Sequence, residues 1–238
     1  MSAWLNIVGI GAGGPQDLPG PARALIANAE LLVGGERHLS MVDNDTARKL
    51  AWKFPLDGIV NEIRAARDQC VVVLATGDPM SFGIGSTLAR HFAPGDMTII
   101  PAPGAFSLAA ARMAWPLHAC TCLTLHGRPL ELLNYHVLPD RRMLILSHDG
   151  TTPGKVAETL CRAGFGPSLM TVFENMGAAN ASVPHDKARD ETDFRPGNEP
   201  GNRSQVAGRV WLVQEKLAVR FCGVPHGGQG VFGRSECG

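Results

Sequence analysis

Residues 75–88, ATGDPMSFGIGSTL, form the stretch whose residue types best suit a ligand-binding turn. They follow an apolar run at 71–74 and include three glycines together with the pair Asp78–Pro79. Glycine permits positive φ and close approach of the backbone to a ligand, whereas proline fixes φ and removes a donor. A phosphate-binding loop would carry Gly-Lys-Ser or Gly-Lys-Thr, but this turn has a carboxylate and no lysine. We therefore predict a rigid backbone platform for a ligand that is not strongly anionic, with Asp78 capping the turn or facing a cation.

A second glycine-rich turn, GIGAGG at residues 9–14, matches the G-x-G-x-x-G fingerprint of dinucleotide-binding proteins. In that fingerprint the third glycine opens a helix whose N-terminus holds the pyrophosphate. Here the sequence PQDLPGP at 15–21 intervenes, and its three prolines prevent a helix from starting at once. The pattern disfavours NAD binding and leaves two interpretations, a plain tight loop or a loop that lines another cofactor at the end of a strand.

These turns belong to a chain in which apolar strands and helical segments alternate. Strands are predicted at residues 5–10, 30–33, 70–75, 97–100, 121–125, 143–147 and 169–174. Helices are predicted at residues 22–29, 58–69, 86–92, 107–115 and 155–163. Such alternation is typical of an α/β protein with a largely parallel sheet and right-handed crossovers.

The pattern changes at Pro116–Leu117, so we predict an N-terminal domain at residues 1–115 and a second α/β domain at 116–177. Residues 178–238 are rich in Asn, Pro, Gly and charged residues without periodicity, and we expect a poorly ordered tail. Within it, residues 210–213 and 217–222 could pair as a late hairpin.

The composition indicates a soluble globular protein. Hydrophobic residues make up 45% of the 238 residues, and the 22 basic residues balance the 22 acidic ones, which gives no support to nucleic-acid binding. No apolar run approaches the ~18 residues of a membrane span and the first residues do not resemble a signal peptide, so we expect a cytoplasmic protein without membrane contact. Six cysteines without C-x-x-C spacing argue against structural zinc; we expect no metal site and mostly buried free thiols.

Several segments together resemble the tetrapyrrole methylase family. They are the glycine turn at 9–13, the turn Gly77-Asp78-Pro79, PAPGAFSLAAARMAWP at 101–116, and Glu174–Asn175 after a strand. Within the family, VGGERHL at 33–39, GDPMSFGIGSTL at 77–88 and LHGRPLE at 125–131 are similar to the branch that methylates C5 of precorrin-6B or precorrin-7 in cobalamin synthesis. The similarity extends over residues 4–176. Residues 178–238 match poorly, which suggests a split C5 module or an altered C-terminus.

The resemblance implies a class III methyltransferase, a two-domain α/β fold with a mainly parallel N-terminal sheet and a mixed C-terminal sheet. It implies S-adenosylmethionine as the methyl donor, bound between the domains. This donor is a sulfonium cation without phosphate, which suits a lysine-free turn beside a carboxylate. Residue by residue, the similarity assigns cofactor contacts to Ala12, Thr76, Gly77, Asp78, Gly104, Ala105, Ser147 and Met176. Ala12 stands where family members usually have proline.

The implied substrate is a precorrin, either free of cobalt or with cobalt bound. It is a tetrapyrrole with several carboxylates, so we expect basic side chains around it. The candidates are Arg37, His38, Arg112 and Arg128, although Arg112 equally suits a solvated helix face. If a base removes a proton as the product forms, His126 is the candidate, because histidine exchanges protons near neutral pH. The alternative is that His126 only holds the geometry of its loop. Asp78 and Glu174 are expected to be structural.

Family analogy further suggests a homodimer and a separate partner that decarboxylates and methylates at C15. Two alternatives stay open. One is a tetrapyrrole methylase for another ring carbon, and the other is a non-catalytic cofactor-binding or scaffold protein.

Overall fold

The computed structural model describes residues 3–11, 13–166, 168–173 and 176, together with strands at 209–213 and 219–220. The chain divides into two compact units between Gly104 and Ala105. The boundary predicted from the sequence, after residue 115, lies later. The difference concerns helix α5 (Ala105–Arg112), because its buried residues Phe106 and Ala109 belong to an apolar core of the second unit.

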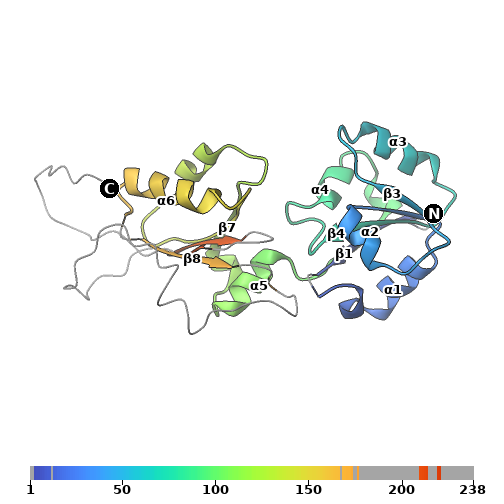
Figure 1. The fold of residues 1–238 in the computed structure, drawn as a ribbon, viewed down its shortest axis with the longest axis horizontal. Coiled ribbons are helices and arrows are strands. Elements are labelled where there is room, and N and C mark those ends of the chain that lie inside the picture. The colour runs from blue at the N-terminus through green and yellow to red at the C-terminus, as the bar shows by residue number, and fades with distance from the viewer. Residues whose placement is uncertain are drawn as a thin grey trace, which may run out of the picture. The chain divides into compact units, whose positions relative to one another are not determined.

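The first unit is built on a five-stranded parallel sheet of order β3-β2-β4-β1-β5. Its strands are β1 (Leu5–Ile10), β2 (Leu31–Gly34), β3 (Arg48–Ala51), β4 (Val71–Thr76) and β5 (Met97–Ile100). Its helices are α1 (Gly20–Ala27), α2 (Glu36–Met41), α3 (Asp57–Ala65) and α4 (Ile84–Leu88). Figure 1 shows α3 and α4 on one face of this sheet and α1 and α2 on the other. The predicted parallel α/β architecture is confirmed.

Both faces of β4 are buried, which explains its uninterrupted apolar sequence. Val71 and Val73 pack with α3 and α4, whereas Val72 and Leu74 pack with α1 and α2. Successive strand residues point to opposite faces, so a strand between two helical layers needs apolar side chains at every position. Because all strands of this sheet are parallel, their carboxyl ends lie at one edge, and the loops that follow them emerge together.

Two elements of the first unit are missing from the sequence prediction, α2 and β3. β3 has the sequence RKLA, in which Arg48 and Lys49 are exposed. It is an edge strand that pairs only with β2 among the described residues. Backbone pairing, rather than an apolar pattern, therefore decides its conformation.

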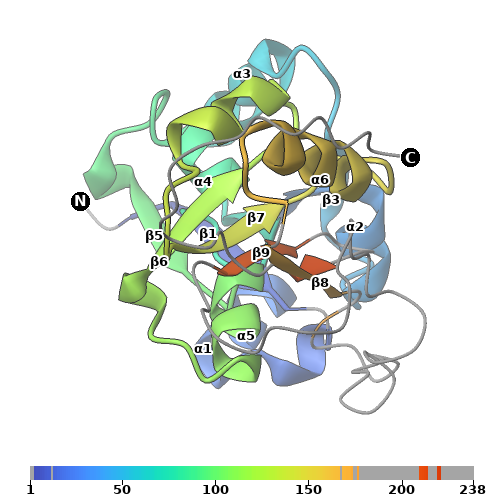
Figure 2. The ribbon, with the colours of Figure 1, turned by 90° about the vertical axis from the view of Figure 1, so that its left-hand side faces the viewer.

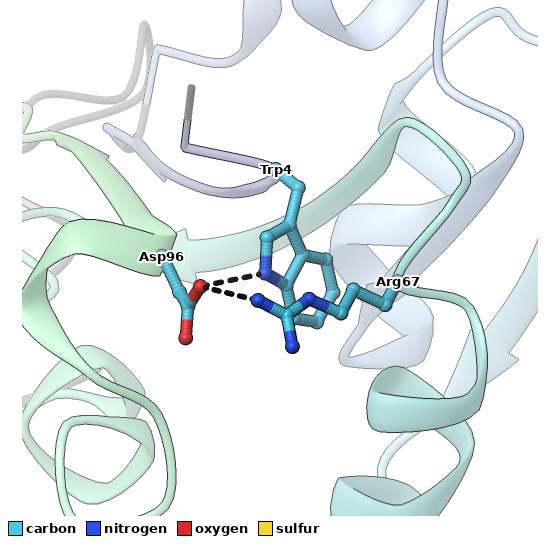
Figure 3. Close-up of polar contacts among 3 residues, drawn as sticks. All are labelled: Trp4, Arg67 and Asp96. Carbon is cyan, nitrogen blue, oxygen red and sulfur yellow. Dashed lines mark hydrogen bonds and ion pairs between the residues drawn. The ribbon is translucent and has the colours of Figure 1, made fainter. Parts of the chain in front are cut away.

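The start of the chain is joined to β5 through Trp4. The indole N–H of Trp4 donates to Oδ1 of Asp96 at 3.1 Å, and a guanidinium nitrogen of Arg67 lies 3.4 Å from the same oxygen (Figure 3). The Trp4 ring meets Phe92 edge-on, with centroids 5.8 Å apart. Trp4 precedes β1 and Asp96 precedes β5, so these contacts lie at the amino edge of the sheet.

The second unit contains a mixed five-stranded sheet of order β10-β8-β9-β7-β6. Its strands are β6 (Cys120–Thr124), β7 (Arg142–Leu146), β8 (Leu169–Phe173), β9 (Arg209–Val213) and β10 (Val219–Arg220). β10 is antiparallel to its neighbours, and the other pairs are parallel. Helix α6 (Thr152–Arg162) covers one face and α5 the other (Figures 1 and 2).

Two of these strands come from the segment that we expected to be a poorly ordered tail. β9 lies between β7 and β8 and is parallel to both. β10 pairs with β9 through Arg220 and Trp211, as in the predicted late hairpin. Both strands overlap the two segments, residues 210–213 and 217–222, that were expected to be able to pair, and pairing on both sides of β9 gives this short apolar run its strand conformation. The rest of residues 178–238 lies outside the described residues, as does Glu174.

The described part of the chain contains four cysteines, all free thiols: Cys70, Cys120, Cys122 and Cys161. Each is half-buried, whereas we expected mostly buried thiols. Burial, with a smaller effect of Cys120, raises the pKa of Cys122 to about 11. Within the same residues, no three His, Cys, Asp or Glu side chains are grouped so that they could hold a metal ion. None of the helices described there is long and apolar enough to span a bilayer.

Candidate cofactor and substrate sites

Three chain segments meet through the backbone of Gly77 at the carboxyl edge of the first sheet. The N–H of Gly77 donates to the carbonyl oxygen of Ile10 at 2.8 Å, and its carbonyl oxygen accepts from the N–H of Ala102 at 3.1 Å. Gly77 has a φ of 57°, and a Cβ on it would lie 2.9 Å from Cα of Gly104. Both observations require glycine at this position. We call residues 9–11, 76–78 and 101–104 the glycine shelf.

The glycine shelf also explains the first glycine of the G-x-G-x-x-G match. A Cβ on Gly9 would overlap the carbonyl oxygen of Gly77 and lie 2.8 Å from the amide nitrogen of Ala102. After Gly14 the chain forms a short 3-10 turn, and α1 begins only at Gly20. The third glycine therefore does not open a helix, which a dinucleotide site of this type needs.

Asp78 braces the turn that follows β4. Its Oδ1 accepts the N–H of Met80 at 2.8 Å, and its backbone carbonyl accepts the N–H of Ser81 at 3.1 Å. Pro79 packs closely against Gly85 of α4, since a Cβ on Gly85 would lie only 2.8 Å from Cβ of Pro79. One carboxylate oxygen of Asp78 is thus used in holding the shelf.

The structure brings together two residues that the resemblance assigned to different ligands. Oγ1 of Thr76, at the end of β4, and Nε2 of His38, in α2, are 3.4 Å apart. Arg37 is the preceding residue of α2 and is exposed. Because β2 is hydrogen-bonded to β4, α2 begins directly beside the glycine shelf. His38 therefore lies next to the predicted cofactor contacts of the first unit.

A second candidate surface lies at the carboxyl ends of β6 and β7. These strands are parallel neighbours, and the N–H of Leu125 donates to the carbonyl oxygen of Leu146 at 2.8 Å. The turns that follow them consequently emerge side by side. The turn after β6 is His126–Gly127–Arg128, here called the HGR turn. Its glycine has a φ of 63°, and the side chains of His126 and Arg128 are exposed.

The sequence prediction missed His148, in the turn after β7. Its Nδ1 accepts a hydrogen bond from the N–H of Gly127 at 3.3 Å, and its ring centroid lies 5.2 Å from that of His126. No motif surrounds His148 in the sequence. Its position could have identified it, because His148 lies directly after a predicted strand, just as His126 lies directly after another.

Asp149 fixes the turn from which His148 projects. Its Oδ1 accepts hydrogen bonds from the backbone and hydroxyl groups of both Thr151 and Thr152, at 2.7–3.1 Å. These bonds, led by those from Thr151, lower the pKa of Asp149 to about 2. Oγ1 of Thr152 in turn accepts the N–H groups of His148 and Asp149, each at 3.2 Å. The start of α6 therefore holds the backbone of His148.

Ser147 and Met176, both predicted cofactor contacts, are buried in the second unit. Ser147 directly follows β7, is 3% exposed, and its hydroxyl has no hydrogen-bond partner among the described residues. A buried hydroxyl without a partner costs about 1–3 kcal/mol, which a polar group of a ligand would offset. Met176 packs in an apolar cluster with Phe106 and Phe173, so the structure gives it a core role.

The remaining predicted residues are not gathered into one cluster. Ala12 lies outside the described residues, and Ala105 is the first residue of α5. Arg112 is in the last turn of α5, where a cation complements the helix dipole. Shortly after it comes Trp115. Its ring centroid lies 4.8 Å from Cζ of Arg142, which is at the amino end of β7. Arg112 belongs to α5, whereas Arg128 belongs to the turn after β6.

The protein has two α/β units. Each unit has candidate ligand residues at the carboxyl ends of parallel strands. The model of the family "Tetrapyrrole (Corrin/Porphyrin) Methylases" matches residues 5–190. The chain belongs to the tetrapyrrole methylase family, and the assignment made from the sequence motifs is confirmed.

Several members of this family are similar to the chain in sequence or structure. Precorrin-6Y C(5,15)-methyltransferase [decarboxylating] from Sinorhizobium sp is 44% identical over 184 residues, which cover 77% of this chain and 45% of that protein. Cobalt-precorrin-7 C(5)-methyltransferase from Salmonella typhimurium is 29% identical over 180 residues, which cover 75% of this chain and 88% of that protein. The solved precorrin-6Y methylase of Archaeoglobus fulgidus matches with a TM-score of 0.58 and 25% identity, over 93% and 98% of the two chains. The chain spans less than half the length of the Sinorhizobium relative.

Proposed function

We propose that this chain is an S-adenosylmethionine-dependent methyltransferase that acts at C5 of a precorrin in cobalamin biosynthesis. The glycine shelf is the observation that carries the proposal. It is a backbone-lined platform braced by Asp78 and without a lysine, in a member of the tetrapyrrole methylase family. A cationic methyl donor that lacks phosphate fits this chemistry, whereas a phosphate loop of the Gly-Lys-Ser type would supply a positive charge.

S-Adenosylmethionine, when bound, supplies an activated methyl group to a carbon nucleophile, and the electron pair of the broken C–S bond stays on sulfur. On the first unit, Gly77 and Gly104 would hold it through close backbone approach, with Thr76 and Asp78 beside them. In the second unit, the buried hydroxyl of Ser147 is a separate candidate to bind a polar group of a ligand.

The side chains of this protein contribute mainly positioning, which is worth up to several kcal/mol of the barrier in reactions of this type. The basic side chains Arg37, His38 and Arg128 would bind carboxylates of the substrate. As the methyl group joins C5, the proton at that carbon leaves, and we assign its removal to the exposed imidazole of His126.

The choice of C5 rests on how much of each relative is matched. The Salmonella protein, named for C5 alone, is matched over 88% of its length, whereas the Sinorhizobium protein, named for C5 and C15, is matched over 45%. We therefore assign the C5 activity to the region that this chain shares with both proteins. We assign the C15 step, with its decarboxylation, to a separate partner or to sequence beyond this chain.

We also propose, by family analogy, that the protein acts in the cytoplasm as a homodimer. Sedimentation of the purified protein should then give the mass of two chains.

The decisive experiment uses the purified protein, a precorrin-6B or precorrin-7 preparation, and S-adenosylmethionine with a carbon-13 methyl group. Carbon NMR of the product should locate the label at C5. A label at another carbon would make the protein a different tetrapyrrole methylase. Binding of the cofactor in isothermal titration without any methylated product would make it a non-catalytic cofactor-binding protein.

A matched pair of variants tests the glycine shelf as the cofactor site. Gly77→Val should abolish binding of S-adenosylmethionine in the same titration, because the side chain blocks backbone approach and opposes the positive φ. Gly58→Val in α3 is the control, since it lies outside the shelf and nothing lies within 4 Å of a Cβ at that position. Unaltered affinity in Gly77→Val would remove the shelf from the cofactor site.

A further inference from the structure

The HGR turn is connected to β7 by a ring nitrogen of His148. The three N–H groups of this turn have three different acceptors. That of His126 donates to Oγ1 of Thr124 at 3.1 Å, and that of Arg128 donates to the carbonyl oxygen of Leu125 at 3.3 Å. Both acceptors lie just before the turn in sequence. The acceptor for Gly127, Nδ1 of His148 at 3.3 Å, comes from a different element.

This hydrogen bond determines the tautomer of His148. A backbone N–H can only donate, so Nδ1 must be without a proton, and the hydrogen of the neutral imidazole is then on Nε2. An imidazolium carries hydrogen on both nitrogens and could not accept from Gly127. The contact seen in the structure is therefore a contact of neutral His148.

The position of His148 is itself determined by the packed part of the second unit. Its backbone N–H donates to Oγ1 of Thr152, which is 6% exposed and belongs to the first turn of α6. Further along the helix, Val156 and Leu160 are fully or almost fully buried in the core beneath β7. A continuous set of contacts thus leads from the core, through the start of α6 and His148, to Gly127.

We propose that His148 is a positioning residue, whose Nδ1 holds the HGR turn so that His126 and Arg128 face the substrate. The proposal deepens the proposed function and depends on it for the identity of that substrate. The ring of His148 also lies beside that of His126, with centroids 5.2 Å apart and planes at 50°.

Two substitutions separate the role of Nδ1 from that of the rest of the ring. In His148→Asn, Oδ1 stands at the same distance along the side chain as Nδ1 and can accept from Gly127. In His148→Gln, the acceptor stands one atom further out, near the place of Nε2. We expect His148→Gln and His148→Ala to lower kcat/KM for the precorrin by about 100-fold, and His148→Asn to recover most of that loss. Thermal unfolding of each variant establishes that it is folded.

The outcomes distinguish the inference from its alternatives. Equal losses in the Asn, Gln and Ala variants would overturn the proposal in favour of a function for Nε2 or for the whole ring. Wild-type kcat/KM in His148→Ala would overturn it as well. The affinity for S-adenosylmethionine should remain similar in the Asn and Gln variants, because the substitution acts on the HGR turn and not on the glycine shelf.

A spectroscopic measurement tests, without measuring catalysis, whether Nδ1 of His148 accepts the hydrogen bond from Gly127. Nitrogen-15 NMR of the folded wild-type protein at neutral pH should show Nδ1 of His148 unprotonated and Nε2 protonated, and the amide signal of Gly127 should shift more in the Gln variant than in the Asn variant. A proton on Nδ1 would refute the proposal. If the wild type methylates no precorrin, the proposed function fails, and the NMR result still establishes whether His148 holds the HGR turn.

Discussion

The carbonyl oxygen of Gly77 occupies the space that a side chain on Gly9 would need. This close approach joins the ends of two neighbouring strands, because Gly9 lies opposite Ala75 in the pairing of β1 with β4. The next segment is held by the same residue, through the hydrogen bond from the N–H of Ala102 to the Gly77 carbonyl. The glycine shelf is therefore part of the core construction of the first unit as well as a candidate cofactor site.

Gly9→Ala should lower the free energy of unfolding by about 1–3 kcal/mol, because backbone atoms of Gly77 and Ala102 would have to move apart. Urea denaturation followed by circular dichroism measures the loss. Gly11→Ala should change stability by less than about 1 kcal/mol, since its Cβ would meet no atom within 4 Å. Similar losses in the two variants would contradict the close approach at Gly9.

Asp78→Ala should weaken binding of S-adenosylmethionine more than Asp78→Asn does. The carboxylate accepts the N–H of Met80 at 2.8 Å, and an asparagine oxygen can still accept it, whereas alanine leaves that N–H without its partner. Isothermal titration of both variants measures the difference. If the two variants lose affinity equally, the negative charge of Asp78 acts on the cofactor directly and bracing of the turn is not its main role.

Asp149→Asn should destabilise the protein at neutral pH by an amount that shrinks in acid. The folded-state pKa of about 2 is lower than the ordinary value of 3.8, so Asp149 contributes stability above pH 3.8. This contribution is lost as the pH falls through the folded pKa of about 2. Unfolding midpoints of wild type and variant, measured between pH 6 and 2, should therefore converge at the acid end. A constant gap over this range would contradict the assigned hydrogen bonds.

The thiol of Cys122 should react slowly with iodoacetamide in the folded protein at pH 8.5. Its pKa is raised from 9.0 to about 11, so the reactive thiolate is on the order of 100-fold scarcer than in the unfolded chain. Because the folded pKa is the higher one, the thiol contributes stability below about pH 9 that is lost as the pH rises through about 11. Peptide mass spectrometry of folded and urea-unfolded samples gives the rates. Equal rates would show that this thiol is not protected.

Trp4→Phe should cost about 1 kcal/mol of stability, because it removes the hydrogen bond to Asp96 at the amino edge of the first sheet (Figure 3). The edge-on contact with Phe92 can persist in this variant. Arg67→Ala should cost less, roughly 0.5 kcal/mol or below, since its guanidinium is more than half exposed and the ion pair is screened by solvent. Denaturant unfolding of both variants tests the order, and a larger effect of Arg67→Ala would reverse the assignment.

Local sequence determined the parts of the fold that local chemistry can specify. The uninterrupted apolar run of β4 predicted a strand buried on both faces, and β5 was predicted at residues 97–100, where the structure has it. The missing lysine and the fixed proline after β4 indicated a backbone platform, and the prolines after Gly14 argued against a dinucleotide site. Such features lie within a few residues of one another, and their φ angles, caps and burial follow from residue type.

Only the tertiary structure decided which distant segments meet. It placed β9 between β7 and β8, gave the charged RKLA segment a strand conformation beside β2, and brought His148 to Gly127 and His38 to Thr76. Each of these relationships depends on hydrogen bonds or contacts between groups far apart in the chain. A single histidine after a strand has no local pattern that reveals its partner, because that partner is set by the register of the neighbouring strand. For this reason the backbone turn at Gly77 could be anticipated from sequence, whereas its contacts with Gly9 and Ala102, and the support of the HGR turn by His148, could not.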